Sequence, residues 1–183
     1  MAMRRLKHCL IVVATLAAVA GCGSLRGESL ARESALVEVA FKHEGAVECV
    51  DALDFEATRG GNASSLFDQC FDLSFASGVP EGTKVSDVSY PDGWGWVTSI
   101  TSFSASYKAS VTTTGVGHAP DITNLKVVAA SCFSITITDS EPPAFRDEEC
   151  GPLADIVDGF PDSRVDPSIA EVIDVIERTR AAD

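Results

Sequence analysis

Hydrophobic and polar residues alternate with a period of two over several short stretches between residues 35 and 138. Alternation of this kind places one side of a strand on a core and the other in water, as in antiparallel sheets. Residues 97–114 are also rich in Ser, Thr and Val, which favours strands. The pattern therefore predicts a mainly β fold, an antiparallel sheet or sandwich. The alternating stretches are 37–42, 53–58, 71–75, 104–111 and 126–137.

The first part of this region also allows a different structure. Residues 35–58 contain several Glu and Ala residues, which are common in helices. The alternative is therefore an α+β fold with a helix in residues 35–58.

Clusters of Gly, Pro, Asn and Asp separate the alternating stretches and predict turns between them. Their close spacing is typical of a meander or sandwich. The clusters are 59–62, 78–82, 91–93 and 115–121.

The pattern changes after residue 138. Pro142 and Pro143 end the last strand, and residues 139–183 hold 13 acidic residues against 4 arginines. Residues 151–159 can form one helical turn. The final segment predicts a C-terminal helix that packs on the sheet, with Asp166 as its cap and Pro167 in its first position. Its hydrophobic stripe consists of Ile169, Val172, Ile173 and Ile176.

The N-terminus has the pattern of a secretory signal. A basic segment with Arg4, Arg5 and Lys7 precedes the uncharged, apolar run 9–20. A helix of about 12 residues rises about 18 Å, which is short of the roughly 30 Å of a bilayer's hydrocarbon core. The run therefore fits a signal peptide better than a permanent membrane span.

The residues that follow are Val19-Ala20-Gly21-Cys22, and this motif resembles the lipobox of bacterial lipoproteins. The resemblance covers the signal region alone. It implies cleavage before Cys22, acylation of Cys22 and an extracytoplasmic protein held on the membrane of the cell envelope by its lipid. The expected organisation is a signal peptide (1–21), a lipidated Cys with a polar tether (22–34) and a single globular domain (35–183). Within that domain, 35–138 is β-rich and 139–183 forms an acidic loop and helical tail.

The remaining cysteines are expected to form two disulfides, because an extracytoplasmic compartment is oxidising. They are Cys49, Cys70, Cys132 and Cys150. Four cysteines allow three pairings. Short loops favour Cys49–Cys70 with Cys132–Cys150, whereas the place of Cys70 and Cys132 on the polar sides of predicted strands allows a bridge between those two.

The charge excludes one class of partner. The chain has a net charge of −13, and removal of the first 21 residues leaves 11 basic against 27 acidic residues, a net charge of −16. Nucleic-acid binding requires clustered Lys and Arg, so no nucleic-acid partner is expected.

An aromatic cluster is the most unusual local feature and the candidate ligand-binding site. Tyr90 precedes Trp94 and Trp96, which would project on the same side of a strand. An exposed pair of indoles could stack on the faces of sugars, whereas a buried pair would cap the core.

The search for catalytic motifs finds no nucleophile elbow, phosphate-binding loop or zinc-protease helix. His43 and His118 fall in predicted turns and are expected to be solvated. Two groups of acids, Asp54 with Glu56 and the run 147–149, are expected to be exposed. Four acids around Gly159 offer the oxygen ligands that calcium prefers, but their spacing differs from that of an EF-hand; they are Asp155, Asp158, Asp162 and Asp166. No metal and no cofactor are expected.

These patterns favour a non-enzymatic role. The chain is expected to be a binding or interaction module of the cell envelope, with another envelope protein or a glycan as its partner. The alternatives are a small envelope enzyme, with a carboxylate or His mechanism that the sequence does not place, and a structural envelope lipoprotein.

Overall fold

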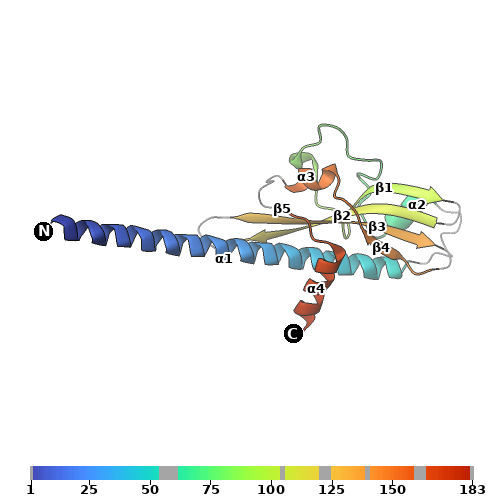
Figure 1. Ribbon diagram of the computed structural model, residues 1–183. Coiled ribbons are helices and arrows are strands. Elements are labelled where there is room, and N and C mark those ends of the chain that lie inside the picture. Colours follow the sequence, from blue (N-terminus) through green and yellow to red (C-terminus); the bar gives the residue numbers. More distant parts are fainter. Residues whose placement is uncertain are drawn as a thin grey trace.

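A computed structural model describes residues 2–53, 62–103, 106–119, 125–138, 141–158 and 164–181, with side chains from Gly27 onward except those of Val85, Val157 and Asp158. A long N-terminal helix precedes a small domain of strands and short helices (Figure 1). The elements in chain order are α1 (Ala2–Asp51), α2 (Ala63–Phe67), the 3-10 helix η1 (Val85–Asp87), β1 (Trp96–Phe103), β2 (Ser106–His118), β3 (Lys126–Thr138), β4 (Ala144–Asp147), α3 (Pro152–Asp158), β5 (Arg164–Val165) and α4 (Ile169–Arg180).

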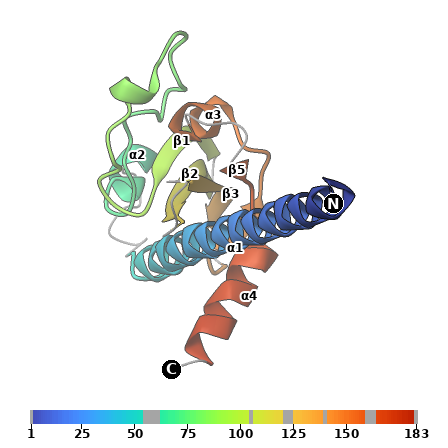
Figure 2. The same ribbon diagram turned by 90° about the vertical axis from the view of Figure 1, so that its left-hand side faces the viewer.

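The strands form one sheet in the order β1-β2-β3-β4, with each neighbouring pair antiparallel. The short strand β5 pairs in parallel with β3 on the same side as β4. Helix α1 crosses one face of the sheet, and α3 lies on the other (Figure 2). The predicted fold class is confirmed: an antiparallel sheet with a C-terminal helix, in the α+β arrangement.

Helix α1 packs on the sheet through one stripe of mostly small and β-branched residues. The buried positions recur every three or four residues, which places them on one side of a helix. The strand predicted for residues 37–42 is therefore wrong, and the helical alternative is confirmed as far as Asp51. Residues 54–58 lie outside the described part of the chain. The stripe consists of Ala31, Ala35, Val39, His43, Ala46 and Val50.

The expected polar tether also differs from the structure. Residues 22–34 belong to α1, and Ala31 is fully buried against the sheet. The last part of the expected tether is thus a packed element of the domain. The small side chain of Ala31 allows close packing on the sheet, whereas a flexible polar segment would make no such contact.

Two glycines of β2 allow α1 to lie very close to the sheet. A Cβ atom at Gly117 would stand 1.7 Å from the carbonyl oxygen of Ala31, and one at Gly115 would stand 2.3 Å from that of Ala35. The turn predicted for residues 115–121 is therefore wrong at its start, because β2 continues to His118. These glycines serve close approach between backbones rather than a turn.

The alternation in residues 71–75 does not form a strand. Only Asp72 forms an isolated bridge, to Trp96, and a turn begins at Ser74. Phe71 joins the hydrophobic cluster under α1, whereas Phe75 packs with Trp96 and Leu153 in a separate cluster that includes α3. The turns expected at 78–82 and 91–93 are present, with positive φ at Gly78, Gly82 and Gly93.

Two disulfides staple the domain. Cys49 at the end of α1 bonds to Cys70 after α2, and Cys132 of β3 bonds to Cys150 before α3. The pairing favoured by the short loops is confirmed. Disulfides of this kind are compatible with an extracytoplasmic location.

Helix α4 differs from its prediction in both its cap and its packing. Its N-cap is Ser168, whose side chain accepts a hydrogen bond from the Glu171 amide, while Glu171 bonds back to the Ser168 amide. The buried residues of α4, Val172 and Val175, belong to a cluster with Ala35 of α1. Helix α4 therefore packs mainly on α1 rather than on the sheet as expected.

Candidate interaction site

The structure separates the aromatic residues that the sequence grouped as a ligand-binding site. Trp96 is 3% exposed and packs with Phe75 and Leu153, whereas Trp94 packs beside the cluster under α1. The two indoles therefore do not project on the same side, and they form no exposed pair. Tyr90, at 81% exposed, stands apart from both.

Trp94 instead packs against α1 at Gly45. A Cβ atom at Gly45 would stand 2.6 Å from the Trp94 ring, and Phe41 meets the same ring edge-on with centroids 5.8 Å apart. Trp94 therefore holds β1 against α1, and its indole serves packing.

His43 is buried in α1 instead of lying in a solvated turn. Its ring meets Phe133 and Phe145 edge-on, with centroids 4.9 and 5.8 Å apart. Among the described residues, its Nδ1 has no hydrogen-bond partner. Burial lowers the pKa of His43, and the negative charge of Asp147 opposes this shift. His43 is thus a neutral packing residue at neutral pH, whereas His118 ends β2 in an exposed position.

The buried His43 predicts a loss of stability in weak acid. Its pKa in the folded chain lies below the ordinary 6.5, so the unfolded chain takes up a proton first. The free energy of unfolding should be unaffected above about pH 6.5 and should fall between about pH 6.5 and 5, where carboxylates are still ionised. Denaturant titrations over this range should show the loss in the wild type and in His118→Gln, but not in His43→Leu. Parallel profiles for the wild type and His43→Leu would refute the assignment.

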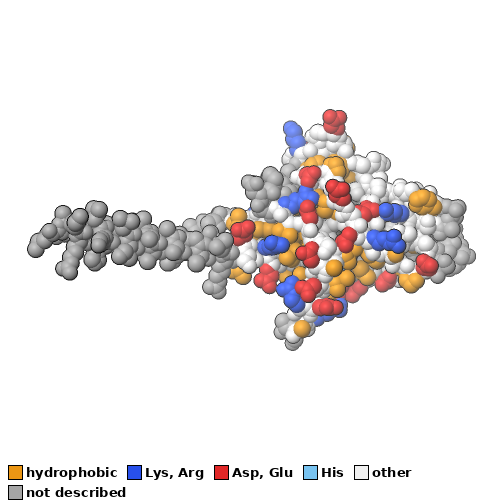
Figure 3. All heavy atoms as spheres, viewed as in Figure 1, with side chains coloured by type: hydrophobic (Ala, Val, Ile, Leu, Met, Phe, Trp, Pro, Cys, Tyr) orange, Lys and Arg blue, Asp and Glu red, His pale blue; other side chains and the backbone are white. Residues whose placement is uncertain are grey.

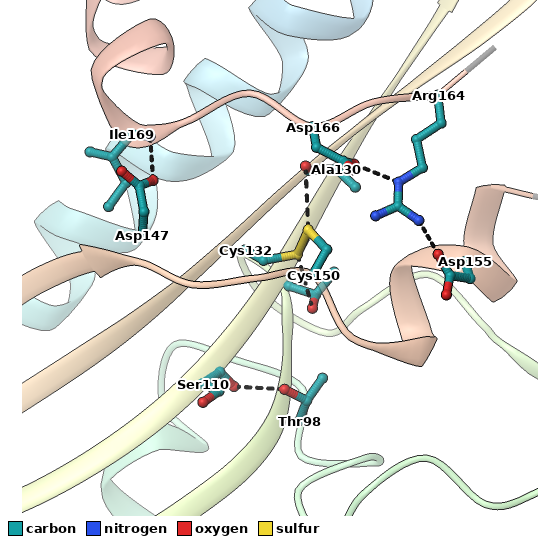
Figure 4. The surroundings of a disulfide bond; sticks show 11 residues. Thr98, Ser110, Ala130, Cys132, Asp147, Cys150, Asp155, Arg164, Asp166 and Ile169 are labelled. Carbon is teal, nitrogen blue, oxygen red and sulfur yellow. Dashed lines mark hydrogen bonds and ion pairs between the residues drawn. A yellow bond between two sulfur atoms is a disulfide. The ribbon is translucent and has the colours of Figure 1, made fainter. Parts of the chain in front are cut away.

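An acidic hollow of about 360 Å³ lies beside the disulfide between Cys132 and Cys150 (Figure 4). Most of its acids already have partners. Asp147 accepts a hydrogen bond of 2.7 Å from the Ile169 amide, and Glu148 forms an ion pair of 2.6 Å with Lys108. The acids that line the hollow are Asp147, Glu148, Glu149, Asp166 and Glu171.

The pKa of Glu148 shows how these contacts hold the acids ionised. Burial alone would raise it, but hydrogen bonds from Lys108, Ser110 and Ser134 lower it below its ordinary value. The hollow therefore uses its carboxylates to join β3, β4 and α4. Among the described side chains, no three His, Cys, Asp or Glu residues are grouped to hold a metal ion.

The aspartates considered as calcium ligands surround an arginine. The guanidinium of Arg164 contacts both Asp155 and Asp166, which fixes β5 to α3 and to the entry of α4 (Figure 4). The side chains of Asp158 and Asp162 lie outside the described residues, as do Asp54 and Glu56.

A groove of about 510 Å³ separates α1 from α4. Leu36, Val37 and Val175 contribute its apolar lining, and Arg32 and Arg178 its cations. Arg178 is already paired with Asp174 at 3.0 Å.

The edges of the sheet differ in how they are protected. β1 pairs with β2 only as far as Thr112, so the later part of β2 has no strand on that side. There α1 supplies the partners: Lys42 Nζ donates to the carbonyl of Thr114 (2.7 Å), and the Val116 amide donates to Glu38 (2.8 Å). Lys42 and Glu38 also pair with each other at 2.7 Å. Charged groups thus occupy this edge.

The opposite edge of the sheet is protected in another way. The short strand β4 follows Pro142 and Pro143 and carries the charged residues Arg146 and Asp147. Short strands, prolines and charges all discourage the addition of a further strand.

Within the described residues, the outer edge of β1 has no such protection over its second half. Asp72 pairs with its beginning through two backbone hydrogen bonds, to Gly95 and from Val97. From Ser99 to Phe103, which we call the β1 edge, no residue in the described part of the chain hydrogen-bonds to the outer side. Residues 93–107 contain no charged side chain. The β1 edge is therefore the candidate interaction site.

Comparison with known proteins adds no assignment, since no protein family, curated protein or solved structure matches this chain.

Sequence reasoning missed the residues that bring α1 close to β2 and that occupy the edge of β2. A signal was present for Gly115 and Gly117, since two glycines at alternate positions face the same side of a strand. A second signal was the spacing of Glu38 and Lys42, which suits an ion pair on a helix.

Proposed function

We propose that this chain is an extracytoplasmic lipoprotein, anchored to the membrane of the cell envelope through Cys22, that acts as a binding or interaction module. Its partner would be another envelope protein or a glycan. The lipobox motif and the two disulfides support the location. Within the described side chains, no helix has the length and hydropathy that a membrane span needs.

The observation that carries the proposal is the continuity of α1. The same helix contains Cys22 and, nine residues later, Ala31, which is the first alanine of the buried stripe. Nine helical residues rise about 14 Å. An acyl anchor at Cys22 would therefore hold the domain close to the bilayer, at a position set by a helix rather than by a flexible linker.

The interaction role is supported by the difference between polar groups that are paired or buried within the fold and the β1 edge. The carboxylates of the acidic hollow mostly have partners within the fold, and the buried His43 has no hydrogen-bonding partner for Nδ1 among the described residues. The β1 edge, in contrast, presents an uncharged strand that is ready for backbone pairing. These features favour binding over catalysis.

Substitution of the anchor cysteine tests the proposal. We expect Cys22→Ala to leave an unprocessed precursor without acyl chains, because the acylated thiol is lost. Membrane fractionation and intact mass would report this. The matched control, Cys9→Ala, removes a cysteine from the signal segment and should be processed like the wild type. Normal processing of Cys22→Ala would contradict the proposal.

A further inference from the structure

We infer that the β1 edge is the contact surface between two copies of this chain, which pair through their β1 strands in antiparallel orientation. The inference goes beyond the proposed membrane role and does not depend on the acyl anchor. A chain that lacked the anchor would keep the same edge.

The charge of the protein favours this edge over the rest of the surface. At a net charge of −13, two copies repel each other wherever acidic surfaces meet. Acidic and basic side chains are scattered over the domain on the face seen in Figure 3. The β1 edge lies within the uncharged residues 93–107, so two copies can meet there without placing like charges opposite each other.

The side chains of the β1 edge also suit pairing with themselves. Ser99, Thr101 and Phe103 are exposed and alternate with Ile100, which packs beside the cluster under α1. Thr101 lies in the middle of the edge. A two-fold axis at this residue would place Thr101 opposite its own copy and Phe103 opposite Ser99 of the second copy.

Such a pairing would cover a hydrophobic side chain that the single chain leaves exposed. Phe103 is 59% exposed at the end of β1. Cross-strand contacts between aromatic or β-branched residues stabilise paired strands. The two β1 strands would run in opposite directions within one shared sheet.

The other edges of the sheet are less suited to pairing with a second copy than the β1 edge. Glu38 and Lys42 occupy the exposed part of β2, and Asp72 occupies the beginning of β1. β4 is short, follows two prolines and is charged. Among the described strands, β1 thus offers the longest edge without charges. A contact of one short strand pair is small, so we expect a dissociation constant of about 10–100 µM.

Sedimentation velocity of the full chain in detergent, from about 1 µM to about 1 mM, tests the inference. The wild type should pass from monomer to dimer. Thr101→Glu adds an acid at the centre of the pairing, where two like charges would stand opposite each other, and should raise the dissociation constant about ten-fold or more. The matched control Ser86→Glu adds the same charge at an exposed position of η1 and should dimerise like the wild type.

A second variant guards against a folding defect. Ser99→Glu places an acid opposite Phe103 of the second copy and should also weaken the dimer, while circular dichroism confirms an unchanged fold. A wild type that stays monomeric at about 1 mM would overturn the inference. So would a dimer that both edge variants leave intact, because the contact would then lie on another surface.

Discussion

Replacing Gly117 with valine is expected to lower the free energy of unfolding by about 3 kcal/mol or more. Any side chain at this position would meet the backbone of α1, since its Cβ would stand 1.7 Å from the carbonyl oxygen of Ala31. Backbone atoms cannot move aside as a flexible side chain can. Helix α1 would have to leave the sheet, and the buried stripe that includes Ala35 and Val39 would lose its cover.

Denaturant unfolding followed by circular dichroism would measure this loss. Gly151→Ala is the matched control, because no atom lies within 4 Å of the added Cβ. It should change the free energy of unfolding by less than about 1 kcal/mol. If Gly117→Val were as stable as Gly151→Ala, the close packing of α1 on β2 would be wrong.

Removing the disulfide between Cys49 and Cys70 is expected to cost about 2–5 kcal/mol. The bond closes a loop across a sequence separation of 21 and ties the end of α1 to the segment that carries Phe71. Cys70 is also buried, so the double variant Cys49→Ala/Cys70→Ala loses both the cross-link and part of the packing.

The unfolding midpoints of the wild type and the double variant would be compared under non-reducing conditions and again with a reductant. Reduction should lower the unfolding midpoint of the wild type below that of the non-reduced variant, because the bond between Cys132 and Cys150 is then lost as well. A double variant that unfolds with the wild type would contradict a stabilising role for this bond.

The sequence predicted the parts of the fold in which local pattern and tertiary environment agree. β2 and β3 were predicted from alternating residues, and the short loops between cysteines close the two observed disulfides. The alternation did not predict that β3 is buried on both faces from Val127 to Ile135, because α1 covers one face and α3 packs on the other. The C-terminal helix was found from its hydrophobic spacing. Its cap was misplaced by two residues, because Ser168 supplies the capping oxygen while Asp166 is engaged by Arg164.

The errors occurred where tertiary contacts decided between two local patterns. Residues 37–42 alternate as a strand would, yet Ala31, Ala35 and Val39 repeat as one side of a helix. The sheet selects the helix, because Gly115 and Gly117 leave room for its backbone. Sequence alone did not show that these glycines face a helix, nor that His43 of that helix would be buried.

The ligand-binding site predicted at Trp94 and Trp96 was wrong for a related reason. Trp94 and Trp96 are two residues apart, which in a regular strand would place them on one side. β1 begins only at Trp96, and Trp94 lies before it, with its amide bonded to the carbonyl of Cys70. The two indoles consequently enter different clusters, and the unprotected edge of β1 emerged only once its neighbours were known.

We propose that one helix joins a lipid anchor at Cys22 to the core of the domain. Intact mass spectrometry of the protein, extracted from its native membranes with mild detergent, would test this anchoring. We expect a chain that begins at Cys22 and carries the added mass of its acyl chains. A chain that begins elsewhere, or one that begins at Cys22 without acyl chains, would contradict it.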